Sequence, residues 1–382
     1  MYNRLVLNRG KPVSKKMIPI ANPVFSEEEI DEVGRVLRSG RVRQGAKVEE
    51  FEENFCQKAG GEYALAVSSG TAALHIAYLS VLNQGDEVIV PAFTFIATAS
   101  TVLFANARPV FADIDKETLT IDPEDVKQKM TSKTKAIAPV HLFGHAADMR
   151  ALSEIAADYN LLLVNDAAQA HGTKLNGKDI GAFDDLNCYS FYPTKNMTTG
   201  EGGMITTNNE ELYQKGKLIR SHGQASKYYH TMLGLNYRMT EVAAVIGIKQ
   251  LEKLDKRVKK RQKNAEFLTG ELEQIEGIQL PFIRNGVVHS FNQFSILLDL
   301  SKFRCNRDGF VKALNDENIG CAVHYPMPLT KQPVFKDFIN HCPVAEEISQ
   351  RILSLPVHPY LSEQDLEKIV EGTKKVAKNF LK

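Results

Sequence analysis

The sequence predicts an α/β protein in which a large unit with a mainly parallel sheet precedes a smaller α/β unit. Short apolar segments alternate with amphipathic segments from Tyr63 to Tyr159, which is the pattern of parallel strands that are joined by helices. Beyond Gly277 a second, smaller series of strands and helices follows. The chain has 382 residues, which is enough for two domains.

The first part of the chain predicts an arm and two helices. Residues 1–17 mix Lys, Arg and Asn with few aliphatic side chains and are expected to form the arm. Ser26 is placed to cap a helix with an acidic first turn, and Gly40 is placed to end that helix. A second helix is expected from Lys47 to Lys58, where apolar residues share one face.

The large unit is expected to follow as alternating strands and helices. Apolar runs that are bounded by turn residues predict the strands, and helical periodicity with capping residues predicts the helices. The predicted strands are 63–67, 87–90, 109–114, 136–142, 161–164 and 204–207, and the predicted helices are 72–81, 96–104, one that starts at Asp122, 149–159 and 210–221.

The end of the chain predicts a connection to the small unit. An Ala-rich helix is expected to start near Glu241, and residues 249–266 predict a long basic helix with one apolar stripe and a solvated face. We place the large domain at 18–255 and the small domain at 256–382. Within the small domain we expect strands at 291–298 and 321–325, a helix at 307–318, and residues 353–356 and a helix from Ser362 to close the fold.

Composition and charge exclude several classes of function. The formal net charge is +1, with 43% hydrophobic and 24% charged residues, so neither nucleic acid nor a membrane is an expected partner. No run approaches 18 apolar residues and no signal peptide is recognisable. Five scattered cysteines without a C-x-x-C pair argue for reduced thiols in the cytoplasm and against a metal site.

Asp166 is a candidate functional residue because of its place at the end of a strand. It follows the apolar run Leu161–Val164, which predicts a buried parallel strand. Open α/β sheets bind ligands outside the carboxyl ends of their strands, so Asp166 is expected to face a ligand. The alternative is that Asp166 only caps the following helix or turn. His141, near another predicted strand end, is either an active-site contact or a core histidine.

Lys195 is the candidate for the chemistry. It lies in the stretch from Asn187 to Met204 among small and polar residues, with Ser190 before it and glycines after it. A lysine that attacks a carbonyl must be desolvated enough to lose its proton and must still be reachable. A glycine-lined loop with few competing charges meets both conditions.

A third candidate is the turn Ser68–Thr71, between a predicted strand and a predicted helix. The first N–H groups of a helix have no partner within it and point outward, so the turn predicts an anion site. A simple helix cap is the alternative reading of the same residues.

Three motifs together resemble one enzyme family. They are S-G-T-A-A-L at Ser69, D-A-A-Q-A-H-G at Asp166 and S-F-Y-P-T-K-N…G-E-G-G at Ser190. In this order they resemble the DegT/DnrJ/EryC1/StrS family, which are sugar aminotransferases of the type I aspartate-aminotransferase fold. The resemblance runs from about Ile18 to the last helix. It implies a seven-stranded, mainly parallel sheet and pyridoxal phosphate as cofactor.

The resemblance implies a role for each of several residues around that cofactor. Lys195 would bind the cofactor covalently and move a proton, and Asp166 would keep the pyridine nitrogen protonated. The remaining roles are the cofactor phosphate for Gly70, Thr71 and Ser190, stacking on the ring for Phe95, and a place beside the ring's 3-oxygen for Gln169.

The resemblance also implies a homodimer with shared sites and two kinds of substrate. Asn236 would reach the phosphate of the partner subunit's cofactor, and Arg238 would meet an acidic substrate group. The expected substrates are a nucleotide-linked keto sugar and an amino acid, with glutamate as the donor. His324 and Tyr325 would line the sugar pocket, but Thr330 departs from the family, where many members carry a basic or imidazole side chain.

Two other functions fit the same fold. One is a sugar dehydratase that depends on the same cofactor, but those members carry His at the position of Lys195. The other is a cofactor-binding regulator without turnover, which would be expected to lack the lysine, the aspartate or the phosphate turn. The chain has all three.

Overall fold

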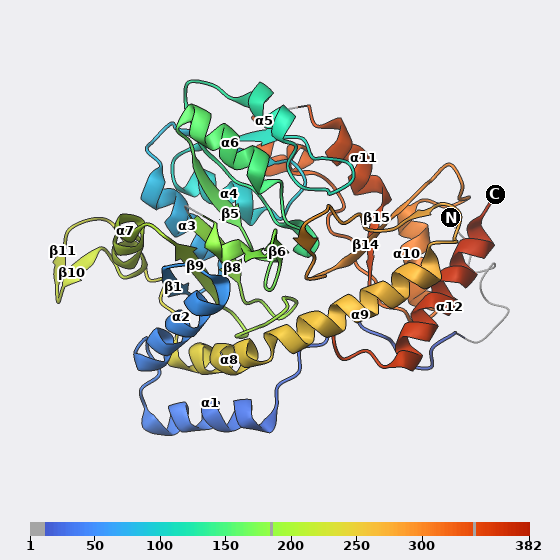
Figure 1. The fold of residues 1–382 in the computed structure, drawn as a ribbon, viewed down its shortest axis with the longest axis horizontal. Coiled ribbons are helices and arrows are strands. Elements are labelled where there is room, and N and C mark those ends of the chain that lie inside the picture. The colour runs from blue at the N-terminus through green and yellow to red at the C-terminus, as the bar shows by residue number, and fades with distance from the viewer. Residues whose placement is uncertain (1–11, 184–185, 339–340) are drawn as a thin grey trace.

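A seven-stranded sheet forms the centre of the computed structural model (Figure 1). The structure describes residues 12–183, 186–338 and 341–382. The strands lie in the order β1-β9-β8-β5-β4-β2-β3. Their bounds are β1 (Tyr63–Val67), β2 (Glu87–Pro91), β3 (Arg108–Ala112), β4 (Thr134–Ile137), β5 (Leu162–Asp166), β8 (Leu186–Ser190) and β9 (Gly203–Thr207).

The direction of the strands confirms a mainly parallel sheet. β9 pairs antiparallel with both of its neighbours, and the other pairs are parallel. The helices of this unit are α1 (Glu27–Ser39), α2 (Ala46–Ala59), α3 (Gly70–Val81), α4 (Ala97–Phe104), α5 (Pro123–Lys129), α6 (Met149–Tyr159), α7 (Glu210–Arg220) and α8 (Glu241–Glu252).

Both faces of the sheet are buried. Leu65 and Val67 of β1 belong to one hydrophobic cluster, whereas Ala64 and Ala66 belong to another. Successive side chains of a strand point to opposite faces, so the two clusters lie on opposite sides of the sheet. This arrangement explains why the strand sequences are almost continuously apolar.

The C-terminal part of the chain has its own sheet and its own hydrophobic cluster. The sheet has the order β12-β14-β15, and α9, α10 and α12 supply much of the cluster. In Figure 1, α9 runs from α8 to this part of the molecule. The bounds are α9 (Leu254–Leu272), β12 (Ile278–Gln279), β14 (Phe294–Leu298), α10 (Arg307–Asp316), α11 (Pro343–Arg351), β15 (Ile352–Leu355) and α12 (Glu363–Phe380).

The domain boundaries stay predictions. Residues 1–11, which make up most of the arm expected at 1–17, lie outside the described residues. The part of the arm that is described packs on the C-terminal unit. The Val13 N–H donates to a carboxylate oxygen of Glu317 at 3.0 Å, and Asn318 Nδ2 donates to the Ser14 carbonyl at 2.9 Å. Among the described residues, no helix combines the length and the apolar character that a bilayer span requires.

Three predicted elements need correction. The basic helix expected at 249–266 is the end of α8 and most of α9, which meet at Lys253. The strand expected at 136–142 ends at Ile137, because Pro139 has no N–H for the ladder; a single bridge joins Val140 to Asp166. The strand expected at 321–325 does not form, and Ala322 makes only one bridge, to Ser354.

Smaller deviations are of two kinds: one strand starts later than expected, and several elements were not predicted. The strand expected at 291–298 starts at Phe294, because Phe291 has a φ of 45°. The elements without a prediction are β6 (Lys174–Leu175), β7 (Lys178–Asp179), β8, β10 (Gln224–Ser226), β11 (Tyr229–His230), β12, β13 (Val287–Val288) and α11.

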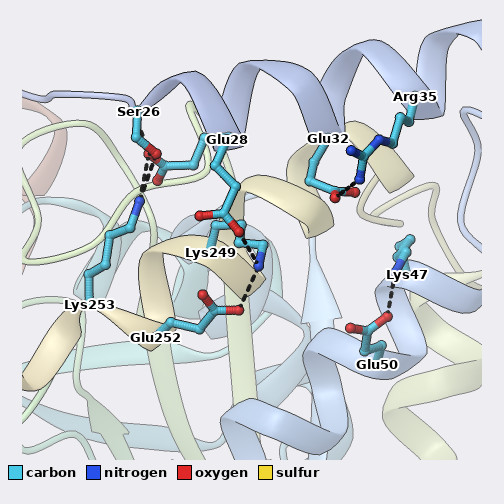
Figure 2. A network of polar contacts seen from close by, with 10 residues as sticks. Ser26, Glu28, Glu32, Arg35, Lys47, Glu50, Lys249, Glu252 and Lys253 are labelled. Carbon is cyan, nitrogen blue, oxygen red and sulfur yellow. Dashed lines mark hydrogen bonds and ion pairs between the residues drawn. The ribbon is translucent and has the colours of Figure 1, made fainter.

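The contact between α1 and α8 includes a buried carboxylate, Glu29. Figure 2 shows two lysines beside it, Lys249 paired with Glu28 and Lys253 bonded to Ser26. Glu29 is 1% exposed, and it accepts hydrogen bonds from the Ser26 backbone N–H at 2.5 Å and from Gln250 Nε2 at 2.5 Å. Lys253 Nζ lies 3.1 Å from the same carboxylate. Burial alone would raise the pKa of Glu29, but these hydrogen bonds outweigh it, so the pKa lies below its ordinary value.

We predict that Glu29→Ala lowers the free energy of unfolding by about 2 kcal/mol, because it leaves buried donors without an acceptor. Glu32→Ala on the same helix breaks only the exposed pair with Arg35 and should cost less than about 0.5 kcal/mol. Urea unfolding measures both values. Equal losses in the two variants would refute the role of Glu29.

The same variant has a pH signature. A lowered folded pKa means that ionised Glu29 adds stability above its unfolded pKa. This contribution is lost as the pH falls through the folded pKa. The difference between wild type and Glu29→Ala should therefore shrink in acid.

Candidate active site

Asp166 is the last residue of β5, and its carboxylate is held from two sides. It is 5% exposed. Thr98 Oγ1 donates to Asp166 Oδ2 at 2.7 Å, and the Ala168 N–H donates to Oδ1 at 3.1 Å. The Ala168 contact is the one expected if Asp166 only caps the following turn. The contact with Thr98, which is distant in sequence, goes beyond that reading.

The electrostatic setting of Asp166 works against its ionised form. Burial raises the pKa of Asp166, and the Thr98 hydroxyl, the Ala168 N–H and the charge of Lys195 oppose the rise. The pKa still lies above its ordinary value. A buried carboxylate of this kind favours a cationic partner at close range.

Lys195 follows β8, in the loop that leads to β9. Its backbone N–H donates to the Tyr192 carbonyl at 2.9 Å, so it belongs to a tight turn. In the described chain, Lys195 Nζ has no hydrogen-bond or salt-bridge partner. Burial lowers the pKa of Lys195, and the charge of Asp166 partly opposes this. Each of the two residues therefore acts electrostatically on the other, so the two side chains lie near each other, and the space around them is the candidate site.

Two histidines, the buried His171 and the half-buried His324, lie near Lys195 in this space. Burial lowers the pKa of His171 to about 3 and that of His324 to about 4, and the charge of Lys195 adds to both effects. Both imidazoles are therefore neutral near pH 7. Lys195 thus faces one potential anion and several neutral groups, a setting that suits an amine that must lose a proton.

Aromatic rings and one amide form another side of the same space. Phe95 is 54% exposed, and its ring centroid lies 6.2 Å from that of Tyr325. The Phe143 N–H donates to Gln169 Oε1 at 2.6 Å, which fixes the orientation of the amide. Gln169 Nε2 is therefore free to donate, and it donates to the Tyr325 hydroxyl at 3.3 Å.

The turn before α3 and the end of β8 form a close contact. Ser69 caps α3 by accepting from the Ala72 N–H at 3.0 Å. A Cβ on Gly70 would lie 2.6 Å from Ser190 Cβ, so only glycine allows this approach. The first free N–H groups of α3 and the Ser190 hydroxyl consequently lie side by side, which is an arrangement that suits an anion.

The strand register places these groups at one edge of the sheet. Val67 at the end of β1 pairs with Gly203, and Gly203 pairs with Ser190 at the end of β8. Asp166 at the end of β5 pairs with Cys188, two residues earlier on β8. The turn, the lysine loop and the aspartate therefore meet at the carboxyl ends of the parallel strands, as expected for a ligand site.

These residues fit the cofactor that the resemblance implies. The turn suits a phosphate, the open face of Phe95 suits an aromatic ring, and buried Asp166 suits a protonated ring nitrogen. Lys195 supplies an amine near these groups, and this amine has no hydrogen-bond or salt-bridge partner among the described residues. Tyr325 and His324 also lie near this space. The charge of Asp166 contributes to a raised pKa of Tyr325, and the charge of Lys195 contributes to a lowered pKa of His324.

Around Asn236 and Arg238, only backbone atoms contact the turn Ser68–Thr71 and the strand before it. Arg238 forms a bridge with Val67, and the Ser68 N–H donates to the Tyr237 carbonyl at 2.8 Å. The side chain of Asn236 is exposed, as is Thr71. The structure does not bring the side chains of Asn236 and Arg238 into contact with Lys195 or Asp166.

Some residues of the site were not predicted. Thr98 lies on α4, 68 positions from Asp166, and no local pattern reveals such a contact. Asn196 Nδ2 donates to the carbonyls of His171 and Ser290, and Asn292 Nδ2 donates to Asn196 Oδ1, so these amides fasten the lysine loop.

His141 is a core histidine by its contacts. It is fully buried, and its Nδ1 accepts from the Ala147 N–H at 3.1 Å. Burial lowers the pKa of His141 to about 3. Its backbone N–H donates to the Asp166 carbonyl at 3.1 Å, so it supports the strand end, and its Nε2 is buried without a hydrogen-bond partner among the described residues.

Comparison with known proteins identifies the family. The model of the DegT/DnrJ/EryC1/StrS aminotransferase family matches residues 23–374. The UDP-2-acetamido-2-deoxy-3-oxo-D-glucuronate aminotransferase of Pseudomonas aeruginosa is 36% identical, over 88% of this chain and 92% of the relative.

Solved structures agree with this match. DesV of S. venezuelae is 33% identical with a TM-score of 0.88, over 92% of this chain and 94% of DesV. Spr1654 of Streptococcus pneumoniae in its PLP form is 28% identical with a TM-score of 0.88, over 95% and 99%.

Proposed function

The chain belongs to the DegT/DnrJ/EryC1/StrS aminotransferase family, and from this premise we propose how its site works and what it binds. The enzyme is an aminotransferase that depends on pyridoxal phosphate. We propose that it moves an amino group from an amino acid, L-glutamate, to a keto group of a nucleotide-linked sugar. The observation that carries the proposal is the juxtaposition of Lys195 and Asp166 at the carboxyl ends of the strands.

In this proposal the chain holds the cofactor at four places. Gly70, Thr71 and Ser190 bind the phosphate through the N-terminus of α3 and the serine hydroxyl. Phe95 covers one face of the ring and keeps water from it. Gln169 lies beside the ring's 3-oxygen, and Asp166 holds the ring nitrogen in its protonated form. When bound, pyridoxal phosphate supplies an aldehyde that takes up the amino group and a ring that withdraws electrons.

Lys195 has two tasks in the proposed reaction. As a neutral amine it would bind the cofactor covalently, and burial lowers the pKa of Lys195, which favours this form. Once freed, Nζ would act as general base and acid: it would accept a proton from the α-carbon of the amino acid and deliver it to the carbon of the cofactor's aldehyde group. Asp166 keeps its negative charge during this transfer, because the cationic ring nitrogen offsets the effect of burial.

We propose that the sugar lies beside Tyr325 and His324 and that Arg238 meets an acidic substrate group. The Thr330 hydroxyl is buried without a hydrogen-bond partner in the described chain. This side chain stands at the position where many family members carry a basic or imidazole side chain. Relatives named as acting on nucleotide sugars support this choice of substrate.

We also propose a homodimer in which Asn236 of one subunit completes the phosphate site of the other. The exposure of Asn236 beside the turn supports this arrangement. The five cysteines are free thiols, which supports a cytoplasmic enzyme. Fractionation of cells that make the protein would locate it, and recovery outside the cytoplasmic fraction would refute this last point.

We predict that purified protein is yellow and that glutamate converts its cofactor in a single turnover. Borohydride should fix the cofactor to the peptide that contains Lys195, as measured by mass spectrometry. Lys195→Ala should lose this attachment and at least about 1000-fold of the single-turnover rate, because the amine is both attachment point and proton carrier.

A matched control for this experiment is Lys256→Ala, which removes an exposed lysine of α9 and should keep both properties. Keto-sugar nucleotides, screened with glutamate and product mass detection, should identify the acceptor. Borohydride fixation that persists in Lys195→Ala would overturn the assignment of the lysine.

Hybrid dimers test whether the sites are shared. In a dimer of one Lys195→Ala chain and one Asn236→Ala chain, shared sites leave one site with both defects and one site intact. Mixing the two inactive variants should therefore restore activity. If Asn236 serves its own chain, both sites stay defective, and the absence of recovery would refute the shared arrangement.

A further inference from the structure

A chain of two hydroxyl groups ends on the Asp166 carboxylate. Thr98 Oγ1 donates to Asp166 Oδ2 at 2.7 Å, and Thr94 Oγ1 lies 3.1 Å from Thr98 Oγ1. Thr98 is fully buried, and Thr94 is 3% exposed. Water therefore has little access to replace either hydroxyl.

The direction of the hydrogen bonds follows from the number of protons. An ionised carboxylate only accepts, and a hydroxyl has a single proton to donate. Since Thr98 gives its proton to Asp166, Thr94 must donate to Thr98. The chain therefore runs from Thr94 through Thr98 to Asp166, and each donor strengthens the next one.

Thr98 is fixed in place by its surroundings. It lies in the first turn of α4, where its N–H donates to the Phe95 carbonyl at 3.2 Å. The Tyr78 hydroxyl donates to the Thr98 carbonyl at 3.0 Å. The same short segment thus carries both Phe95, with its open ring face, and the hydroxyl that contacts Asp166.

Few other groups can stabilise the charge of Asp166. The titratable groups that face it are Lys195, Tyr78, Cys188 and Tyr325, and only Lys195 can be a cation. Burial raises the pKa of Asp166, and the hydroxyl of Thr98 is the largest opposing influence, ahead of the Ala168 N–H and Lys195.

We propose that Thr98 is a positioning residue that keeps the Asp166 carboxylate charged and aimed at the ring nitrogen of the cofactor. The inference rests on the proposed function, because it assumes that Asp166 meets this nitrogen. Thr98 acts through Asp166 and has no contact with the substrate. Loss of the Thr98 hydroxyl should therefore weaken only the interaction between Asp166 and the ring nitrogen.

The test compares two ligands that differ only at this nitrogen. Equilibrium dialysis of cofactor-free protein gives the Kd of pyridoxal phosphate and of its 1-deaza analogue, in which carbon replaces the ring nitrogen. Phosphate and lysine contacts are common to both ligands, so the ratio of the two Kd values reports on the ring nitrogen. A general loss of structure would weaken both ligands alike.

Thr98→Val keeps the shape of the side chain and removes the hydroxyl. We expect the wild type to prefer pyridoxal phosphate, and Thr98→Val to reduce this preference about tenfold, as for the loss of a hydrogen bond to a charged group. Thr98→Ser keeps the hydroxyl and should keep most of the preference. If Thr98→Val does not fold, as judged by circular dichroism, Thr98→Ala carries the same expectation.

Thr101→Val is the matched control. Thr101 is a fully buried threonine of the same helix, but its hydroxyl donates to the Ala97 carbonyl at 2.6 Å. The preference should remain at the wild-type value in this variant. An unchanged preference in Thr98→Val, or an equal loss in Thr101→Val, would overturn the inference alone. A wild type that does not bind pyridoxal phosphate would overturn the proposed function with it.

Discussion

Burial of two groups of opposite charge at one edge of the sheet is the constraint on which the rest of the site depends. Burial disfavours the ionised forms of both Lys195 and Asp166, and each residue partly relieves the other. Neither is satisfied by a direct ion pair among the described contacts. In our account a cofactor with an aldehyde at one end and a basic nitrogen at the other resolves this, because it takes up the amine and gives the carboxylate a cation.

The fold keeps the two residues in place by rigid means. Asp166 is part of β5, and Lys195 lies in a turn that Asn196 and Asn292 fasten to the segment before β14. That segment also receives Arg261 of α9, whose guanidinium donates to the Phe291 carbonyl at 3.1 Å. The small unit therefore supports the lysine loop directly.

Sequence patterns predicted what local chemistry determines. Ser69, Gly70, Asp166 and Lys195 became candidates because a helix start, a strand end and a lysine in a glycine-lined loop leave local signals, and their roles around the cofactor came from the resemblance. Long-range contacts left no local signal, so the contact between Thr98 and Asp166 was not predicted. The strand β8 was not predicted because Asn187 and Cys188 interrupt its apolar pattern. The strand expected at 321–325 failed because its backbone finds only one partner, at Ser354.

A crystal structure of the protein grown with pyridoxal phosphate tests the central claim most directly. The account predicts one cofactor whose aldehyde carbon is bonded to Lys195 Nζ and whose ring nitrogen lies about 2.8 Å from a carboxylate oxygen of Asp166. Its phosphate should lie against Gly70 and Ser190. A cofactor bound elsewhere, or one whose ring nitrogen faces solvent while Asp166 keeps only its protein contacts, would contradict the account.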